Sequence, residues 1–160
     1  MLCHRAFGVY AVIYKEGNLL VIHKGREPYR NRYDLPGGSL KEGEGLLEAV
    51  IREVKEETGL SAAISEQIGT ADFMLPWKWK NFTHVHHTAV LYVAEATGNL
   101  QVPEQFAGQD AKEAAWIPIE QLAAANSSPL VTQAVKWLSS AELPLETVCY
   151  SDWEVKEGCF

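Results

Sequence analysis

The sequence has few cysteines, with only Cys3, Cys149 and Cys159 among its 160 residues. Their number is odd, and their spacing matches neither a metal-binding nor a redox-active pair of cysteines. A framework of disulfide bonds is therefore excluded as the basis of the fold. We expect reduced thiols in a cytoplasmic protein.

Long hydrophobic runs are also missing. Apolar stretches such as Val9 to Tyr14 are far shorter than the roughly 20 residues that a helix needs to span a bilayer. The first residues do not show a basic region followed by an apolar one, as an export signal would. We therefore expect no membrane segment and no export.

Basic residues are outnumbered, because 14 Lys and Arg stand against 21 Asp and Glu and give a net charge of −7. This balance argues against general binding to nucleic-acid backbones, which depends on clustered Lys and Arg side chains. An acidic protein can still hold a polyphosphate if its carboxylates first hold a divalent cation. Clusters of carboxylates are thus the place to look for a site.

The composition, 47% hydrophobic and 22% charged, matches one globular domain of mixed α and β structure. Runs of β-branched and aromatic residues predict strands, and turn residues between the first two runs predict a hairpin. Apolar residues at helical spacing predict helices. The expected hairpin covers residues 6–14 and 19–22, the later strands 62–74, 83–96 and 115–117, an aromatic loop 75–79, and the helices 45–58 and from 128 onwards.

Three carboxylates share one face of the first predicted helix. At 100° per residue, Glu53, Glu56 and Glu57 lie within an arc of about 100°, and Glu57 overlaps the apolar stripe that contains Val50 and Val54. A partly buried acid beside two like charges is unfavourable unless it is paired or binds a metal ion. The alternative is a solvated, salt-bridged helix face, which is the more common explanation for such a run of charges.

The residues around these acids resemble a known motif at every defined position. The frame runs from Gly38 through Glu44 to Arg52-Glu53-Val54-Lys55-Glu56-Glu57-Thr58-Gly59-Leu60, and it resembles the Nudix box. Its seven Gly, Glu and Arg positions would match by chance in roughly one sequence position in 10⁸. The resemblance extends over about residues 5–139 and implies the Nudix fold, a mixed β-sheet sandwiched between helices, in a domain of residues 1–142.

The resemblance implies a Nudix hydrolase, a pyrophosphohydrolase that cleaves a phosphoanhydride bond in a nucleoside diphosphate derivative. It implies that Mg²⁺ or Mn²⁺ binds to Glu53, Glu56, Glu57 and the carbonyl of Gly37, and that Arg52 pairs with Glu44 to fix the loop. Oxygen ligands suit these ions, which agrees with the residue types. The small-molecule substrate would be a nucleotide, with ADP-ribose or a related nucleotide sugar as the candidates.

Other residues are candidates for supporting roles. A loop acid often assists in the family, and Asp110 is slightly preferred over Glu113. Lys24 and Arg26 could contact phosphates, although a solvated basic loop is as plausible. Trp77 could stack on a nucleobase, or it could simply pack at the surface.

Three histidines, His84, His86 and His87, could be a zinc site, but this interpretation is disfavoured. Alternation along a strand puts His84 and His86 on one face and His87 on the other, and no cysteine joins them.

Pro76 follows Leu60 by sixteen positions, a spacing that resembles ADP-ribose pyrophosphatases. The alternatives are a house-cleaning pyrophosphohydrolase of nucleoside triphosphates, a capped-RNA or dinucleotide polyphosphate substrate, or a non-catalytic nucleotide-sensing domain. The three intact glutamates favour catalysis, because a sensing domain does not need them.

The C-terminal extension, residues 143–160, is too apolar for a solvated tail. We expect it to pack on the domain or to form a homodimer contact, with the homodimer slightly preferred. Its apolar residues are Leu143, Leu145, Val148, Tyr150, Trp153 and Phe160.

Overall fold

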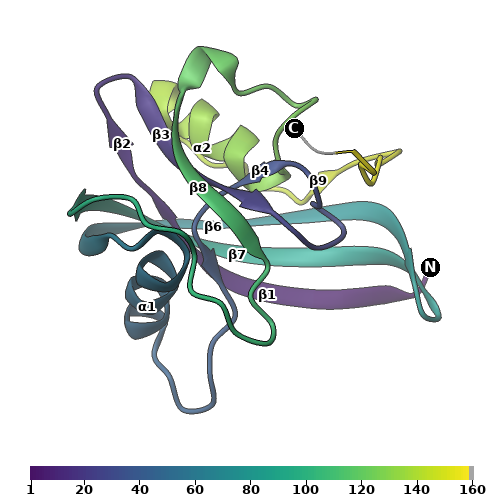
Figure 1. The fold of residues 1–160 in the computed structure, drawn as a ribbon. Coiled ribbons are helices and arrows are strands. Elements are labelled where there is room, and N and C mark those ends of the chain that lie inside the picture. Colours follow the sequence, from purple (N-terminus) through teal and green to yellow (C-terminus); the bar gives the residue numbers. More distant parts are fainter. Residues whose placement is uncertain (159–160) are drawn as a thin grey trace.

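The computed structural model describes residues 1–158, which form two β-sheets and two α-helices (Figure 1). Phe160 and Cys159, to which the sequence drew attention, lie outside the described residues. The strands are β1 (Cys3–Val12), β2 (Tyr14–Lys15), β3 (Asn18–Lys24), β4 (Tyr33–Asp34), β5 (Gly37–Gly38), β6 (Ser61–Trp79), β7 (Phe82–Thr97), β8 (Ala111–Pro118) and β9 (Val148–Cys149). The helices are α1 (Leu46–Thr58) and α2 (Pro129–Ser140), with a short 3-10 turn at Ile119–Gln121.

The larger sheet has the strand order β5-β1-β7-β6-β9. Strand β1 runs parallel to β7, from Cys3 opposite His84 to Val12 opposite Val93, whereas β6 and β7 form a long antiparallel hairpin. Because β1 has a neighbour on each side, it is an interior strand. Its second half, from Gly8 to Val12, is fully buried, as is typical of a central strand.

In the smaller sheet, β3 pairs with β2, β4 and β8. Strand β2 pairs with the first residues of β3, and β4 pairs with its residues Ile22 and His23. The predicted hairpin of residues 6–14 and 19–22 is wrong for most of its first strand, because only Tyr14 and Lys15 pair with β3. The apolar run of β1 instead enters the other sheet. Periodicity alone does not identify the partner of a buried strand. Here β1 pairs with β7, which is distant in the sequence, and not with the adjacent β3.

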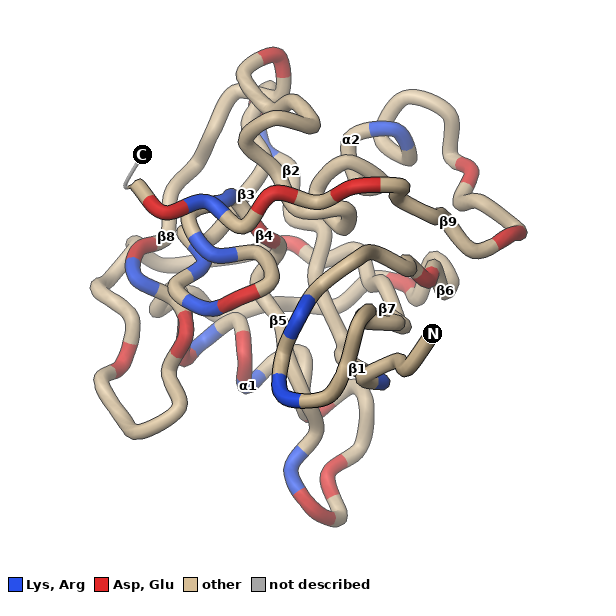
Figure 2. Tube along the Cα trace, turned by 90° about the vertical axis from the view of Figure 1, so that its right-hand side faces the viewer, with Lys and Arg blue, Asp and Glu red and all other residues tan. Residues whose placement is uncertain are grey.

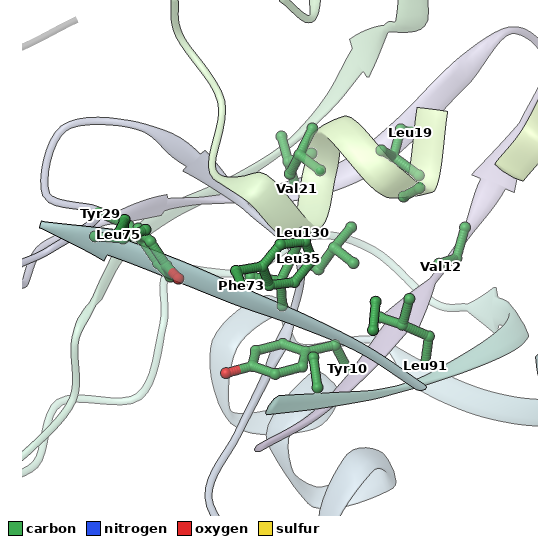
Figure 3. Close-up of a cluster of buried hydrophobic side chains, with 14 of the residues drawn as sticks. Tyr10, Val12, Leu19, Val21, Tyr29, Leu35, Phe73, Leu75, Leu91 and Leu130 are labelled. Atoms are coloured by element: carbon green, nitrogen blue, oxygen red, sulfur yellow. The ribbon is translucent and has the colours of Figure 1, made fainter. Parts of the chain in front are cut away.

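Two hydrophobic clusters lie on opposite sides of the larger sheet. In one, Val50 and Val54 of α1 pack with Val9 of β1. In the other, Leu130 of α2 packs with Phe73 of β6 (Figure 3). Figure 1 shows the two helices on opposite sides of the strands. The expectation of a mixed sheet between helices is therefore confirmed.

Both ends of helix α1 and the start of helix α2 lie within one residue of the positions that short-range sequence signals indicate. Helix α1 covers residues 46–58, and Gly59 follows it with a φ of 79°, the left-handed conformation that glycine adopts easily. Helix α2 follows Ser128, whose side chain accepts a hydrogen bond from the amide of Val131 at 3.2 Å. Both helices were predicted from the sequence, with a one-residue difference at the start of each.

The predicted aromatic loop, residues 75–79, is instead the end of strand β6. Trp77 and Trp79 alternate with Pro76 and Lys78, which is the period of a strand. A proline is tolerated here because β9 pairs with β6 only at Phe73 and Met74, so the outer edge is free at Pro76. The turn of the hairpin is thereby moved to residues 80–81.

The C-terminal segment lies against the domain. The amide of Tyr150 donates to the carbonyl of Met74 at 2.9 Å, and Val148, Tyr150 and Trp153 pack against the core on the α2 side. Leu145, in contrast, is fully exposed.

Cys3 and Cys149 are free thiols. Within residues 1–158, neither helix has the length and apolar character required to cross a membrane.

Candidate active site

Helix α1 places the three predicted glutamates on its face toward β5. Glu57 is buried, with 1% of its surface exposed, while Glu53 and Glu56 each expose 16% of their side chains. The overlap of Glu57 with the apolar stripe thus puts a carboxylate in the protein interior. Helical spacing alone accounts for this placement.

The buried carboxylate of Glu57 is only half satisfied. Its Oε1 accepts a hydrogen bond from the amide of Gly37 at 2.8 Å, but its Oε2 is buried with no hydrogen-bond partner. Burial raises the pKa of Glu57 well above its usual value, Glu53 raises it further, and nearby Lys24 opposes this shift. A buried oxygen without a partner is the kind of group that a cation stabilises.

The guanidinium of Arg52 joins several acids of the site. It donates to Glu44 through Nε at 2.7 Å and through Nη2 at 2.8 Å. Its Nη1 donates to Glu53 at 2.9 Å and to Glu56 at 3.1 Å. The hydrogen bond from Arg52 holds the pKa of Glu44 at about 2, so Glu44 stays ionised. This pair ties the loop before α1 to the helix.

Glycines bring the loop backbone close to these acids. Gly37 has a φ of +153°, and a Cβ there would overlap the carbonyl oxygen of Val9. A Cβ on Gly38 would lie 2.9 Å from Oε1 of Glu53. A side chain at position 37 would therefore separate the loop from β1, whereas one at position 38 would displace the carboxylate of Glu53.

The residues present fit a divalent cation by their chemistry. Three carboxylates and a backbone carbonyl offer only oxygen ligands, which suit Mg²⁺ or Mn²⁺, and Glu57 Oε2 lacks a partner. Within residues 1–158, however, no three acid, His or Cys side chains converge as they stand. Glu53 and Glu56 face Arg52 instead, so coordination would require their side chains to turn away from it.

A cavity of about 390 Å³ lies over this cluster. It opens between the Gly37-Gly38 loop, α1 and the segment before β8, and Glu53, Glu56 and Asp110 line it. A second cavity of about 410 Å³ adjoins it, between the first residues of β1, the end of β6 and the loop after β3. The two cavities share five lining residues, Tyr10, Lys24, Arg26, Ser39 and Asp110.

The two candidate loop acids differ in their position. Asp110 lines both cavities and pairs with Lys24, whose Nζ is 2.8 Å from its Oδ2. Glu113 is exposed on β8, opposite His23, and lines neither cavity.

Lys24 is held among acids. Its Nζ lies 3.7 Å from Asp34 as well as 2.8 Å from Asp110. Burial lowers the pKa of Lys24, but the two carboxylates together raise it more, so the side chain stays charged. Arg26 is exposed and lines both cavities.

Trp77 lines the second cavity, away from the glutamates. Its ring is stacked on Trp79 with centroids 5.4 Å apart, and its Nε1 donates to Glu27 at 3.1 Å. One face of the Trp77 ring is thus already occupied by another ring.

A buried chain of polar side chains on the floor of the second cavity was not predicted from the sequence. Both ring nitrogens of His87 are 2.9 Å from tyrosine hydroxyls, Nε2 from Tyr10 and Nδ1 from Tyr29. Burial, helped by the charge of Lys24, lowers the pKa of His87 to about 3, so the ring is neutral. The sequence does contain a signal for this buried histidine. His87 alternates with Val85 and Ala89 along the strand, so alternation puts it on the same, apolar face.

The neighbouring histidines have other partners. His84 Nδ1 is 2.8 Å from the hydroxyl of Thr83, and His86 Nε2 is 2.6 Å from Asp72.

Comparison with known proteins identifies the family. The profile of the NUDIX domain matches residues 3–139. The chain belongs to the Nudix family. The family predicted from the Gly38–Leu60 motif is thereby confirmed, and the relatives agree with a hydrolase that acts on pyrophosphate bonds.

Individual relatives are similar over most of the chain. An ADP-ribose pyrophosphatase of Methanocaldococcus jannaschii is 29% identical over 136 residues, 84% of this chain and 75% of the relative. Phosphatase NudJ of Escherichia coli is 29% identical over 154 residues, 94% of each chain. Three other curated relatives are matched over less than half of their own length. A Nudix hydrolase structure from Nitrosomonas europaea, 24% identical, matches the fold with a TM-score of 0.69 over 89% of this chain and 94% of its own.

Proposed function

We propose that this Nudix hydrolase cleaves the phosphoanhydride bond of ADP-ribose or a related nucleoside diphosphate derivative in a reaction that depends on Mg²⁺ or Mn²⁺. The observation that carries the proposal is the buried Glu57, whose Oε2 lacks a partner, on the same helix as Glu53 and Glu56, which line a cavity. Burial of a carboxylate oxygen without a partner is unfavourable, and a bound cation would offset this cost. The similarity to an ADP-ribose pyrophosphatase supports the choice of substrate.

The reaction adds one water molecule across the P–O–P linkage of the diphosphate. An oxygen–phosphorus bond forms at one phosphorus, the bond from that phosphorus to the bridging oxygen breaks, and ADP-ribose yields AMP and ribose 5-phosphate. A bound divalent cation supplies charge stabilisation at the phosphate oxygens and lowers the pKa of a coordinated water. Glu53, Glu56, Glu57 and the carbonyl of Gly37 would hold it.

The other residues of the cavity orient the substrate and accept a proton from the attacking water. Asp110 lies where the two cavities meet, so we assign it, rather than Glu113, the role of the assisting acid. Arg26 is exposed at the same junction, where it can meet a phosphate. Lys24 acts mainly by holding Asp110 and Asp34 in place, because both acids already pair with its ammonium group.

The second cavity would take the part of the substrate that lies away from the cleaved bond. It adjoins the glutamate cavity through shared residues, and Trp77 lies on its wall. The stacking of Trp77 on Trp79 leaves at most one ring face for a base.

A second candidate function is removal of a phosphate from a nucleoside di- or triphosphate. The similarity to phosphatase NudJ favours it, since that match covers 94% of both chains. The two functions differ in their products. ADP-ribose cleavage releases two organic monophosphates, whereas phosphatase activity releases inorganic phosphate.

The test is a product assay on a panel of nucleotides with Mg²⁺ or Mn²⁺. The panel contains ADP-ribose, a nucleotide sugar, dATP, 8-oxo-dGTP and a dinucleotide polyphosphate, and products are separated by chromatography. AMP from ADP-ribose, lost on addition of EDTA, is the expected result. Faster release of inorganic phosphate from the nucleoside triphosphates would replace the first candidate with the second, and turnover that persists in EDTA would overturn the metal dependence.

We further propose a cytoplasmic location, on the basis of the free thiols of Cys3 and Cys149. We also propose that the chain forms a homodimer through its C-terminal extension. Sedimentation of the full chain tests it, and a monomer would rule it out.

A further inference from the structure

The C-terminal tail, residues 141–158, follows the end of the family match at residue 139 and reaches the loop of residues 25–32 after β3. We propose that this tail is a strap that fixes the loop as one wall of the second cavity, with Trp153 as its positioning residue. The strap would thereby set the affinity for the part of the substrate away from the cleaved bond. The effect on substrate affinity rests on the proposed function, whereas the fixed position of the loop does not.

The contact between strap and loop centres on Trp153. Its indole Nε1 donates to the carbonyl of Pro28 at 2.8 Å. The guanidinium of Arg32 lies 4.2 Å above its ring, and the ring of Tyr29 meets it edge-on with centroids 5.8 Å apart. Trp153 therefore touches the middle and the end of the loop at once, by a hydrogen bond, a cation–π contact and an aromatic contact.

Hydrogen bonds on both sides of Trp153 extend the contact. Arg32 Nη2 donates to the carbonyl of Glu154 at 2.9 Å, and Asn31 Nδ2 donates to the carbonyl of Lys156 at 3.0 Å. Arg30 pairs with Glu157 at 3.0 Å. Figure 2 shows the end of the tail running alongside the basic part of this loop. Side chains of the loop thus satisfy backbone carbonyls of the strap, which gives the strap a defined register.

The strap is anchored at its other end to the larger sheet. Strand β9 pairs with β6 at Phe73 and Met74, and the hydroxyl of Thr147 donates to Asp72 at 2.7 Å. The strap therefore connects the outer edge of the sheet to the loop after β3. Movement of the loop away from the sheet would have to break contacts along this whole segment.

The opposite side of the loop faces the cavity. Arg26, Glu27, Pro28 and Tyr29 all line it. The hydroxyl of Tyr29 is 2.9 Å from Nδ1 of His87 on the cavity floor. The loop therefore contacts His87 on its cavity side and Trp153 on the opposite side, and the position of Tyr29 depends on both.

The loop ends are fixed independently of the strap. The amide of Lys24 donates to the carbonyl of Arg32 at 3.0 Å, and the amide of Asn31 donates to the carbonyl of Lys24 at 2.9 Å. Loss of Trp153 should therefore loosen the middle of the loop while its ends stay closed. The glutamate cavity is lined by Glu53 and Glu56 of α1, which the strap does not touch, so the chemical step should be spared.

Kinetics with two substrates test this selectivity. ADP-ribose would extend into the second cavity, whereas ribose 5-diphosphate, which is ADP-ribose without the adenosine, has a diphosphate but no nucleobase. For Trp153→Ala we expect about a tenfold higher KM for ADP-ribose and a kcat within twofold of the unchanged protein. The KM for the truncated substrate should rise by no more than about twofold, because Arg26 alone among residues 25–32 lines the glutamate cavity. Trp153→Phe, which keeps an aromatic ring without the N–H donor, should give an intermediate KM. Leu145→Ala, at an exposed position of the same tail, is the matched control and should change neither constant.

Hydrogen–deuterium exchange tests the structural part without requiring activity. Trp153→Ala should speed amide exchange within residues 25–32 and leave α1 unchanged. A general loss of stability would instead lower kcat for both substrates and speed exchange in α1 too, and that result would overturn the inference. Equal exchange of the loop in Trp153→Ala and the unchanged protein would also overturn it. If no nucleotide is hydrolysed, the proposed function fails, while the exchange experiment still decides whether the strap holds the loop.

Discussion

The amide of Gly37 and the carboxylate of Glu57 are joined by a hydrogen bond of 2.8 Å, although the two residues are 20 positions apart. This contact docks the loop before α1 onto Glu57, which is buried in the interface between helix and sheet. It orients one carboxylate oxygen toward the backbone and leaves the other without a partner. The same interaction therefore fixes the fold of the loop and prepares a ligand for a cation.

Glu57→Gln and Glu56→Gln should each lower kcat by roughly a thousandfold, a loss of about 4 kcal/mol of transition-state stabilisation. In Glu57→Gln the new amide oxygen could still accept the hydrogen bond from Gly37, so the fold should survive while the charge is lost. Activity is measured with ADP-ribose and Mg²⁺, and folding by circular dichroism. Glu48→Gln, exposed in the first turn of the same helix, is the control and should stay within twofold. Near-normal turnover of Glu57→Gln would remove Glu57 from the site.

Glu44→Gln and Arg52→Ala should reduce both activity and thermal stability. Arg52 donates to Glu44, Glu53, Glu56 and the carbonyl of Ser39, so its loss leaves several acids without their partner. Melting temperatures are followed by calorimetry beside the kinetic assay. An unchanged melting temperature in both variants would show that this cluster does not position the loop.

Asp110→Asn should lower kcat by ten- to a hundredfold, whereas Glu113→Gln should leave it unchanged, because only Asp110 lines the two cavities. Steady-state kinetics of the two variants with one nucleotide substrate make the comparison. The reverse order of effects would assign the assisting role to Glu113. Since Asp110 also pairs with Lys24, the melting temperature of Asp110→Asn must be measured as well.

His87→Gln should make stability less sensitive to acid. His87 is neutral in the folded protein because its pKa is lowered to about 3, whereas an unfolded histidine titrates near pH 6.5. The unfolded chain therefore binds a proton that the folded chain excludes, and stability falls as the pH drops below about 6.5. At pH 5 this residue should contribute a loss of about 2 kcal/mol relative to pH 8. Urea unfolding at the two pH values measures it, and equal pH dependence in variant and unchanged protein would contradict it.

Features that depend on neighbouring residues in the sequence were predictable. Helix α1, the glycine that ends it and the face shared by its glutamates all follow from spacing within a few turns. Helix α2 follows from Ser128 and Pro129 in the same way. These signals are local, so no other part of the chain can override them easily.

Features that join distant segments were not predictable. The pairing of β1 with β7 and the chain Tyr10–His87–Tyr29 depend on residues that meet only in the folded sheet. Lys24 was a candidate for contacting a phosphate, and the pairing of its ammonium group with acids from two other segments was not foreseen. A basic residue on a loop has no local signal that reveals such partners, because the free energy gained depends on tertiary contacts.

The interior position of β1 imposes an order on folding. This strand occupies residues 3–12, yet its parallel partner β7 covers residues 82–97, so β1 cannot be enclosed between its neighbours until β7 has been synthesised. Contacts so distant in sequence form slowly because a long loop must close first. The apolar residues of β1 are therefore exposed during synthesis, and the β6–β7 hairpin, whose strands are adjacent in the chain, is the template on which they are finally covered.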